Sequence, residues 1–140
     1  MAGHLLIRKY YECFNERRFE EASDLFAVAA VVKRPPFGTS HDGGPGWIGY
    51  SRRLLDAFPD ARLRIEHVEQ RGDTICEVEL VFTGTLARDL DVPGHGVVKG
   101  NGRPVTLRLG EMLEIRGNMI TFTRLSFDTA ALVRPATREK

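Results

Sequence analysis

The sequence has few of the features that mark a membrane, metal-binding or nucleic-acid-binding protein. None of its apolar runs reaches the 18 residues that a membrane-spanning helix needs, so no membrane association is expected. The four histidines are spread along the chain and predict no metal cluster. The net charge is +1 and the charges are interspersed, without the basic stripe of nucleic-acid-binding proteins. We therefore expect neither a metal nor a nucleic acid as partner.

The chain also has only two cysteines, Cys13 and Cys76, which lie far apart in the sequence. This usage predicts two buried, reduced thiols in a cytoplasmic protein. The N-terminus goes almost at once into an amphipathic pattern with Glu and Arg, which is not typical of a secretory signal. With 140 residues and 42% hydrophobic residues, the chain is expected to form one domain over residues 1–140.

Apolar periodicity divides the chain into a helical first part and a strand-rich second part. Spacings of three and four predict helices over 4–16, 19–26 and 47–58, with a strand over 28–33 between the last two. Alternating apolar residues then predict strands over 62–70, 74–85, 105–115 and 119–128, with Phe82 on the apolar face of the second. The glycine-rich stretch 88–103 is expected to be irregular, as a mobile lid or a dimer contact.

The last two predicted strands form a hairpin around Arg116-Gly117-Asn118, and each strand carries an acid in an otherwise largely apolar register. Glu111 shares its face with Leu107, Leu109 and Leu113, and Asp128 shares its face with Ile120 and Arg124. A buried carboxylate costs several kcal/mol unless it is paired, so both acids are candidates for a functional site. The alternative is that both acids point into solvent.

This element order predicts an α+β fold in which three N-terminal helices pack on a curved, mostly antiparallel sheet. If the sheet wraps around the helices, its concave face encloses a pocket, the default place for a small-molecule site.

A set of short motifs runs in order along nearly the whole chain. They are residues 10–15 (YYECFN), 25–26 (LF), Gly49, 57–60 (AFPD), 71–73 (RGD), 84–85 (GT) and the ending 120–128. Together they resemble the SnoaL-like polyketide cyclases. These proteins share the cone-shaped fold named for nuclear transport factor 2, which also includes ketosteroid isomerase, scytalone dehydratase and limonene epoxide hydrolase.

The resemblance implies roles for three residues. Tyr10 matches the tyrosine that donates to an oxyanion in the isomerases, and Glu111 matches their second, acidic donor. Asp128 matches the aspartate near the chain end that is the expected base of the cyclases. The sequence departs from the families at Arg34, where the isomerases have their base, and at Arg124 and Leu86, where the cyclases have a tryptophan and a histidine.

The remaining site candidates are substrate contacts. Arg34 and Arg124 could hold a carboxylate or phenolate of the substrate, whereas an Arg124–Asp128 pair could equally be a surface ion pair. His67 alternates with Leu63 and Ile65, so it faces the pocket or is a satisfied core histidine. Trp47 begins the third helix and is expected to pack on the sheet, where it also borders the pocket together with Phe82.

The sequence therefore predicts a cofactor-independent enzyme that performs acid–base chemistry on a cyclic or polyketide-like carbonyl compound, as a cyclase, isomerase or dehydratase. One alternative is a non-catalytic ligand-binding or dimerisation module of the same fold. Another is a cofactor-free hydrolase or oxygenase. A homodimer is expected through the outer face of the sheet, where Met112, Glu114, Leu125 and Phe127 are predicted to lie.

Overall fold

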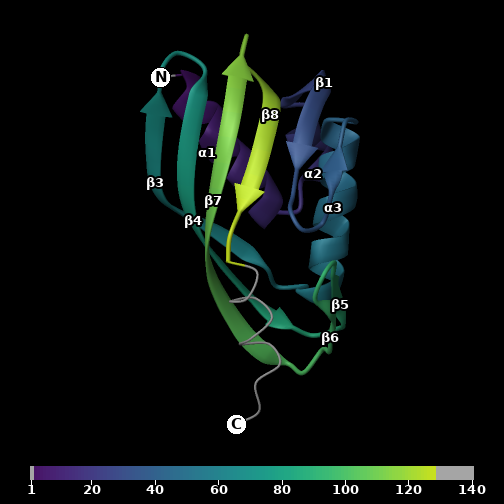
Figure 1. The fold of residues 1–140 in the computed structure, drawn as a ribbon. Coiled ribbons are helices and arrows are strands. Elements are labelled where there is room, and N and C mark those ends of the chain that lie inside the picture. Colours follow the sequence, from purple (N-terminus) through teal and green to yellow (C-terminus); the bar gives the residue numbers. More distant parts are fainter. Residues whose placement is uncertain (1, 129–140) are drawn as a thin grey trace.

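The computed structural model, which describes residues 2–128, has three helices packed on one face of a curved six-stranded sheet (Figure 1). The helices are α1 (Ala2–Asn15), α2 (Phe19–Ser23) and α3 (Gly44–Ala57). The sheet has the order β2 (Thr39–Ser40), β1 (Phe26–Lys33), β8 (Met119–Ser126), β7 (Arg103–Arg116), β4 (Ile75–Leu86), β3 (Arg62–Arg71). All its neighbouring strands are antiparallel except β1 and β8. This is the α+β architecture that the sequence predicted.

The apolar stripe of α1 faces the sheet, and a polar side chain fixes the end of this helix. Its buried residues are Leu6, Ile7, Tyr10, Tyr11, Cys13 and Phe14. At the C-terminal end, the Asn15 side-chain amide donates to the carbonyl oxygen of Leu63 at 2.9 Å and accepts from the Leu63 amide at 2.8 Å. Two complementary hydrogen bonds therefore attach α1 to the edge strand β3.

The hairpin of β7 and β8 turns where the sequence predicted it, at Gly117 and Asn118, which both have positive φ, +57° and +62°. The stretch 88–103 was expected to be irregular, and this was wrong. It contains a small hairpin of β5 (Leu90–Val92) and β6 (Gly96–Val98). Three apolar side chains explain it, because Leu90, Val92 and Val98 are all buried and anchor the hairpin to the core.

Two β-bulges change which residues face the helices. In β3 the register shifts between Ile65 and His67, and in β8 Thr121 is the extra residue between Ile120 and Phe122. Since side chains alternate with a period of two, one extra residue exchanges the two faces for the rest of the strand. Figure 1 shows the resulting curvature of the sheet around the helices.

The bulge in β8 corrects the predicted outer face of the sheet. Leu125 and Phe127 were expected to point outward, but both line the space between sheet and helices. Met112 and Glu114 lie in β7, whose alternation the bulge in β8 does not change, and both are partly exposed.

No helix within residues 2–128 is long and apolar enough to cross a membrane.

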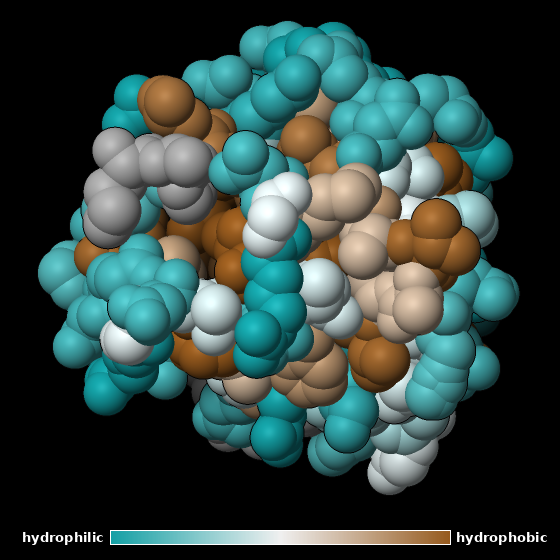
Figure 2. Space-filling model, turned by 90° about the horizontal axis from the view of Figure 1, so that it is seen from above, coloured by the Kyte–Doolittle hydropathy of each residue, from teal (hydrophilic) through white to brown (hydrophobic). Residues whose placement is uncertain are grey.

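Figure 2 views the molecule of Figure 1 from above. On this face, hydrophobic residues gather near the centre among hydrophilic ones.

Candidate active site

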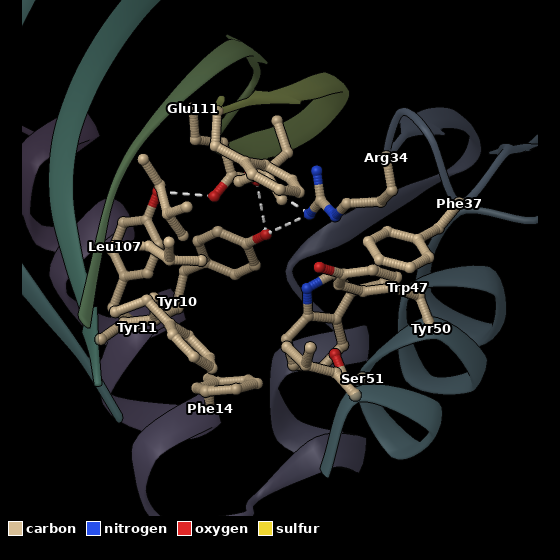
Figure 3. Close-up of a pocket in the computed structure, with 16 residues that line it drawn as sticks. Tyr10, Tyr11, Phe14, Arg34, Phe37, Trp47, Tyr50, Ser51, Leu107 and Glu111 are labelled. Carbon is tan, nitrogen blue, oxygen red and sulfur yellow. Dashed lines mark hydrogen bonds and ion pairs between the residues drawn. The ribbon is translucent and has the colours of Figure 1, made fainter. Parts of the chain in front are cut away.

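A narrow cavity lies between the helices and the concave face of the sheet (Figure 3). Aromatic and leucine side chains form most of its wall, among them Phe14 of α1, Trp47 of α3, and Leu107 and Leu109 of β7. Its free volume is about 50 Å³. Small-molecule sites commonly have about 300–1,000 Å³, so the cavity as it stands holds little more than a water molecule or two.

One carboxylate, Glu111 of β7, lies in the wall of this apolar cavity and is paired with Arg34 at the end of β1. Arg34 Nη2 lies 2.9 Å from Glu111 Oε2, and each residue is only 4% exposed. Arg34 Nη2 also donates to the Tyr10 hydroxyl at 2.8 Å, and that hydroxyl donates to Glu111 Oε2 at 2.8 Å. The three groups form a closed triangle of hydrogen bonds, which Figure 3 shows at one side of the cavity.

Two further hydroxyl groups complete the surroundings of Glu111. Tyr11 donates to Glu111 Oε1 at 2.7 Å, and the buried Thr123 donates to Oε2. Oε2 thus accepts three hydrogen bonds from the described residues, whereas Oε1 accepts one. A carboxylate oxygen has room for about two acceptor bonds, so Oε1 is the oxygen with capacity left for a ligand.

The protonation states in this cluster follow from burial and charge. Burial, and then the neighbouring Glu111 carboxylate, raise the pKa values of Tyr10 and Tyr11 well above the usual range. Both tyrosines therefore stay neutral and act as hydrogen-bond donors. Burial is the largest single effect on Arg34 and lowers its pKa. The interactions with Glu111 and the neighbouring tyrosines together outweigh it, so the pKa of Arg34 lies above its ordinary value. The cluster consists of one cation, one carboxylate and two neutral phenols.

Phe37 and Tyr50 separate this inner cavity from the protein surface. Their rings are 5.9 Å apart, and Figure 3 shows both beside Arg34. Both residues also line two outer hollows of about 360 and 380 Å³, one towards β5 and one towards β2. Displacing these two rings would join the inner cavity to a space of the size that ligand sites commonly have.

The structure brings the candidates Tyr10, Arg34 and Glu111 together, and it places Trp47 and Phe82 in the wall of the same cavity. Trp47 packs on Tyr10, Phe14, Phe19 and Phe26, with ring centroids 5.7–6.4 Å apart. The catalytic and binding roles of all these residues stay predictions.

The other three candidates lie elsewhere. His67 and Arg124 border a hollow on the outer face of the sheet, and both are exposed. Asp128, which follows β8, is also exposed and does not line the cavity. The outward placement of His67 and Arg124 follows from the two bulges, since strict alternation would have turned both side chains towards the helices.

Sequence reasoning missed Tyr11, Thr123, Tyr50 and Ser51. Neighbouring residues of a helix point about 100° apart, so the helical pattern alone gives no reason to place Tyr10 and Tyr11 at one carboxylate. Two tyrosines in succession, on the apolar stripe of a helix, were the available signal. Strict alternation from Ile120 would turn Thr123 outward, and the bulge at Thr121 that turns it inward is not visible in the sequence.

Among the side chains of residues 4–128, no group of three His, Cys, Asp or Glu residues is placed to hold a metal ion. The cavity wall presents hydrogen-bonding groups, one ion pair and apolar surface.

Comparison with known proteins agrees with this architecture. A family model described as SnoaL-like polyketide cyclase matches residues 4–135. No curated protein matches the sequence significantly.

Solved structures share the fold at low sequence identity. A proposed polyketide cyclase from Xanthomonas campestris has 18% identity and a TM-score of 0.78, with 96% of each chain covered. IdmH from Streptomyces antibioticus, also a proposed polyketide cyclase, has 23% identity and a TM-score of 0.76, covering 93% of this chain and 94% of that one. A Catenulispora acidiphila protein of ketosteroid isomerase-like fold, solved with trimethylamine, has 17% identity and a TM-score of 0.76, with 94% and 91% covered.

Proposed function

This chain belongs to the SnoaL-like polyketide cyclase family, and from that premise we propose that it performs acid–base chemistry on a cyclic or polyketide-like carbonyl compound. In this proposal Glu111 removes a proton from the carbon next to the carbonyl group. The observation that carries it is a buried carboxylate in an apolar cavity, with one oxygen that has acceptor capacity left. Family membership supports a small-molecule site and leaves the reaction open.

The charges of the cluster suit this step. The C–H bond breaks, its proton goes to Glu111 Oε1, and its electron pair forms the enolate whose charge lies on the carbonyl oxygen. Glu111 becomes neutral at the same moment, so the cation of Arg34 loses its counter-ion and is left to stabilise the enolate. A charge held ready in a site of low dielectric is an effective form of transition-state stabilisation. The neutral hydroxyls of Tyr10 and Tyr11, which donate to the Glu111 carboxylate at 2.8 and 2.7 Å, are further hydrogen-bond donors beside it.

The use of a carboxylate as the base also restricts the substrate. A carboxylate is a much weaker base than the enolate of a simple ketone, so it removes a proton readily only from an unusually acidic carbon. It suits a carbon made acidic by two activating groups, such as two carbonyls or a carbonyl and an aromatic ring. Polyketide-like compounds contain such carbons, and the same proton transfer begins a cyclisation, an isomerisation or a dehydration.

Asp128, which the family resemblance implied as the general base, does not have that role in this proposal. It is exposed, whereas a general base must come within about 2.6–3.2 Å of the proton it takes. Glu111 is the acid that faces the cavity, and we assign the base to it.

Two observations favour a second function, a binding module without catalysis. The free volume is only about 50 Å³, and Glu111 and Arg34 satisfy each other. A module of this kind would bind a ligand in the cavity and leave its protons unchanged.

Hydrogen–deuterium exchange separates the two functions. The probe is 2-tetralone, a two-ring ketone whose most acidic carbon lies between the carbonyl and the aromatic ring. In D₂O, the protein is expected to accelerate deuterium incorporation at this carbon, measured by NMR. Glu111→Gln should lose about 10²–10⁴ of that acceleration, the usual contribution of a positioned base. Binding without acceleration would support the module and exclude the catalytic proposal.

A further inference from the structure

A second polar group, the hydroxyl of Ser51 on α3, faces the same cavity and has no hydrogen-bond partner among the described residues. Ser51 is fully buried, and its Oγ is the buried side-chain oxygen or nitrogen in this part of the chain that no contact satisfies. Buried polar groups are nearly always hydrogen-bonded, so such an exception needs an explanation. Ser51 lines the cavity, which places the unsatisfied oxygen where a ligand would lie.

The position of Ser51 in α3 makes a purely structural explanation unsatisfactory. Trp47, Tyr50, Ser51 and Leu54 have the spacing of one helix face and all line the cavity. An alanine there would complete this face without leaving a polar group unpaired. A buried serine in a helix commonly bonds back to the carbonyl four residues earlier, but Ser51 makes no such bond to Trp47.

Ser51 and the Glu111 cluster lie on opposite sides of the cavity. In Figure 3 the hydrogen-bonded triangle of Arg34, Tyr10 and Glu111 is at the top, and Ser51 is near the bottom with its oxygen directed inward. The rest of the cavity wall is largely apolar and aromatic, with Phe14 and Trp47 as examples. The cavity therefore presents two polar ends separated by hydrophobic surface.

We propose that Ser51 is a specificity-determining residue that selects ligands with a second oxygen, opposite the carbonyl group held at the Glu111 cluster. This inference rests on the proposed small-molecule site and adds the substrate class, a flat, apolar ring system with an oxygen at each end. A hydroxyl or a second carbonyl fits Ser51, because a serine hydroxyl both donates and accepts.

A cycle of two proteins and two ligands tests the inference. The proteins are the parent and Ser51→Ala, and the ligands are 2-tetralone and 6-hydroxy-2-tetralone, whose added hydroxyl lies at the far end from the ketone. Affinity is measured by the fluorescence of Trp47, the single tryptophan of the sequence, in the cavity wall. The hydroxylated probe should bind the parent about tenfold more tightly than 2-tetralone, as one good neutral hydrogen bond allows. This preference should disappear in Ser51→Ala.

Ser126→Ala is the matched control, because it makes the same chemical change on an exposed residue of β8. It should leave the preference for the hydroxylated probe unchanged. Thermal unfolding without ligand gives a second readout. Ser51→Ala should unfold at the same temperature as the parent or higher, since it removes an unsatisfied buried hydroxyl.

Each outcome bears on one or both proposals. A preference that persists in Ser51→Ala, or a marked loss of stability in that variant, would overturn the role of Ser51. A Ser51-dependent preference without any deuterium exchange would confirm the specificity residue and exclude the catalytic proposal. Deuterium exchange without a Ser51-dependent preference would support the catalytic proposal and exclude Ser51 as a specificity residue. Failure of both probes to bind the parent at millimolar concentration would overturn both proposals.

Discussion

The guanidinium of Arg34 and the carboxylate of Glu111 are joined at 2.9 Å across the wall of the cavity, and both are almost fully buried. One comes from the end of β1 and the other from the middle of β7, 77 residues apart in the sequence. A buried charge without its partner strongly destabilises the folded state, so the stability of the fold requires both residues or neither.

Removing only one of the two charges should therefore be costly. Arg34→Met is expected to lose about 3–5 kcal/mol of unfolding free energy, because the Glu111 carboxylate stays buried without its cation. The double variant Arg34→Met/Glu111→Gln should recover most of this loss. Urea unfolding measures the free energy of unfolding of the single and the double variant. Arg71→Met is the control, since its pair with Glu77 is half exposed at 3.1 Å and should contribute only about 0–1 kcal/mol. Equal losses in Arg34→Met and Arg71→Met would contradict the coupling.

Tyr50 should make stability fall in alkaline solution. Burial raises the pKa of Tyr50 from the ordinary value of 10.0 to about 12. Between these two pH values the unfolded tyrosine has lost its proton and the folded one has kept it, so the free energy of unfolding falls as the pH rises. The contribution approaches about 1.4 kcal/mol per pH unit for one group.

Comparison with Tyr50→Phe isolates this effect from the other tyrosines. Urea unfolding at pH 9 and pH 11 should show a smaller decrease in Tyr50→Phe than in the parent protein. Identical decreases would show that the Tyr50 hydroxyl is not stabilised in its neutral form.

Phe37 is expected to control access to the cavity. Its ring lies between the inner cavity and the outer hollows and packs against Tyr50. Phe37→Ala should let 2-tetralone associate and dissociate several-fold faster, as measured by stopped-flow fluorescence of Trp47. Leu5→Ala, at an exposed position of α1, is the control and should leave both rates unchanged. Unaltered rates in Phe37→Ala would mean that ligands enter by another route.

The homodimer stays a prediction, and the structure changes the surface on which it rests. Leu125 and Phe127 face inward, so an outer-face contact would use polar and charged side chains such as Glu66, Glu79 and Arg108, together with Met112. An interface with so many charges is expected to weaken as salt rises. Light scattering at high micromolar protein should give a dimer mass at low salt and a smaller mass at 1 M salt. A monomer mass under both conditions would contradict the prediction.

Most of the fold could be predicted from the sequence because its signals are local. The apolar spacing of α1, the stop before Pro59 at the end of α3 and the Gly117-Asn118 turn each act over a few residues. Glu111 was found in the same way, as an acid within the apolar face of β7. The small β5–β6 hairpin was missed, since its three-residue strands are too short to show an alternating pattern.

The rest of the site depends on contacts that no local pattern contains. One extra residue at Thr121 turned Thr123, Leu125 and Phe127 inward, and a register shift before His67 turned that residue outward. Bulges form where the sheet must curve around the helices, which is a property of the whole fold. The unsatisfied hydroxyl of Ser51 likewise becomes visible only when all its neighbours are in place.

The most direct test of the central claim compares Glu111 with Asp128 in one assay. Glu111→Gln and Asp128→Asn remove the same charge with the same change of shape, one in the cavity and one on the surface. Deuterium incorporation into 2-tetralone, followed by NMR in D₂O, should be slowed about 10²–10⁴-fold by Glu111→Gln. Asp128→Asn should keep the parent rate. Loss of exchange in Asp128→Asn, with the parent rate retained in Glu111→Gln, would contradict the assignment of Glu111 as the base.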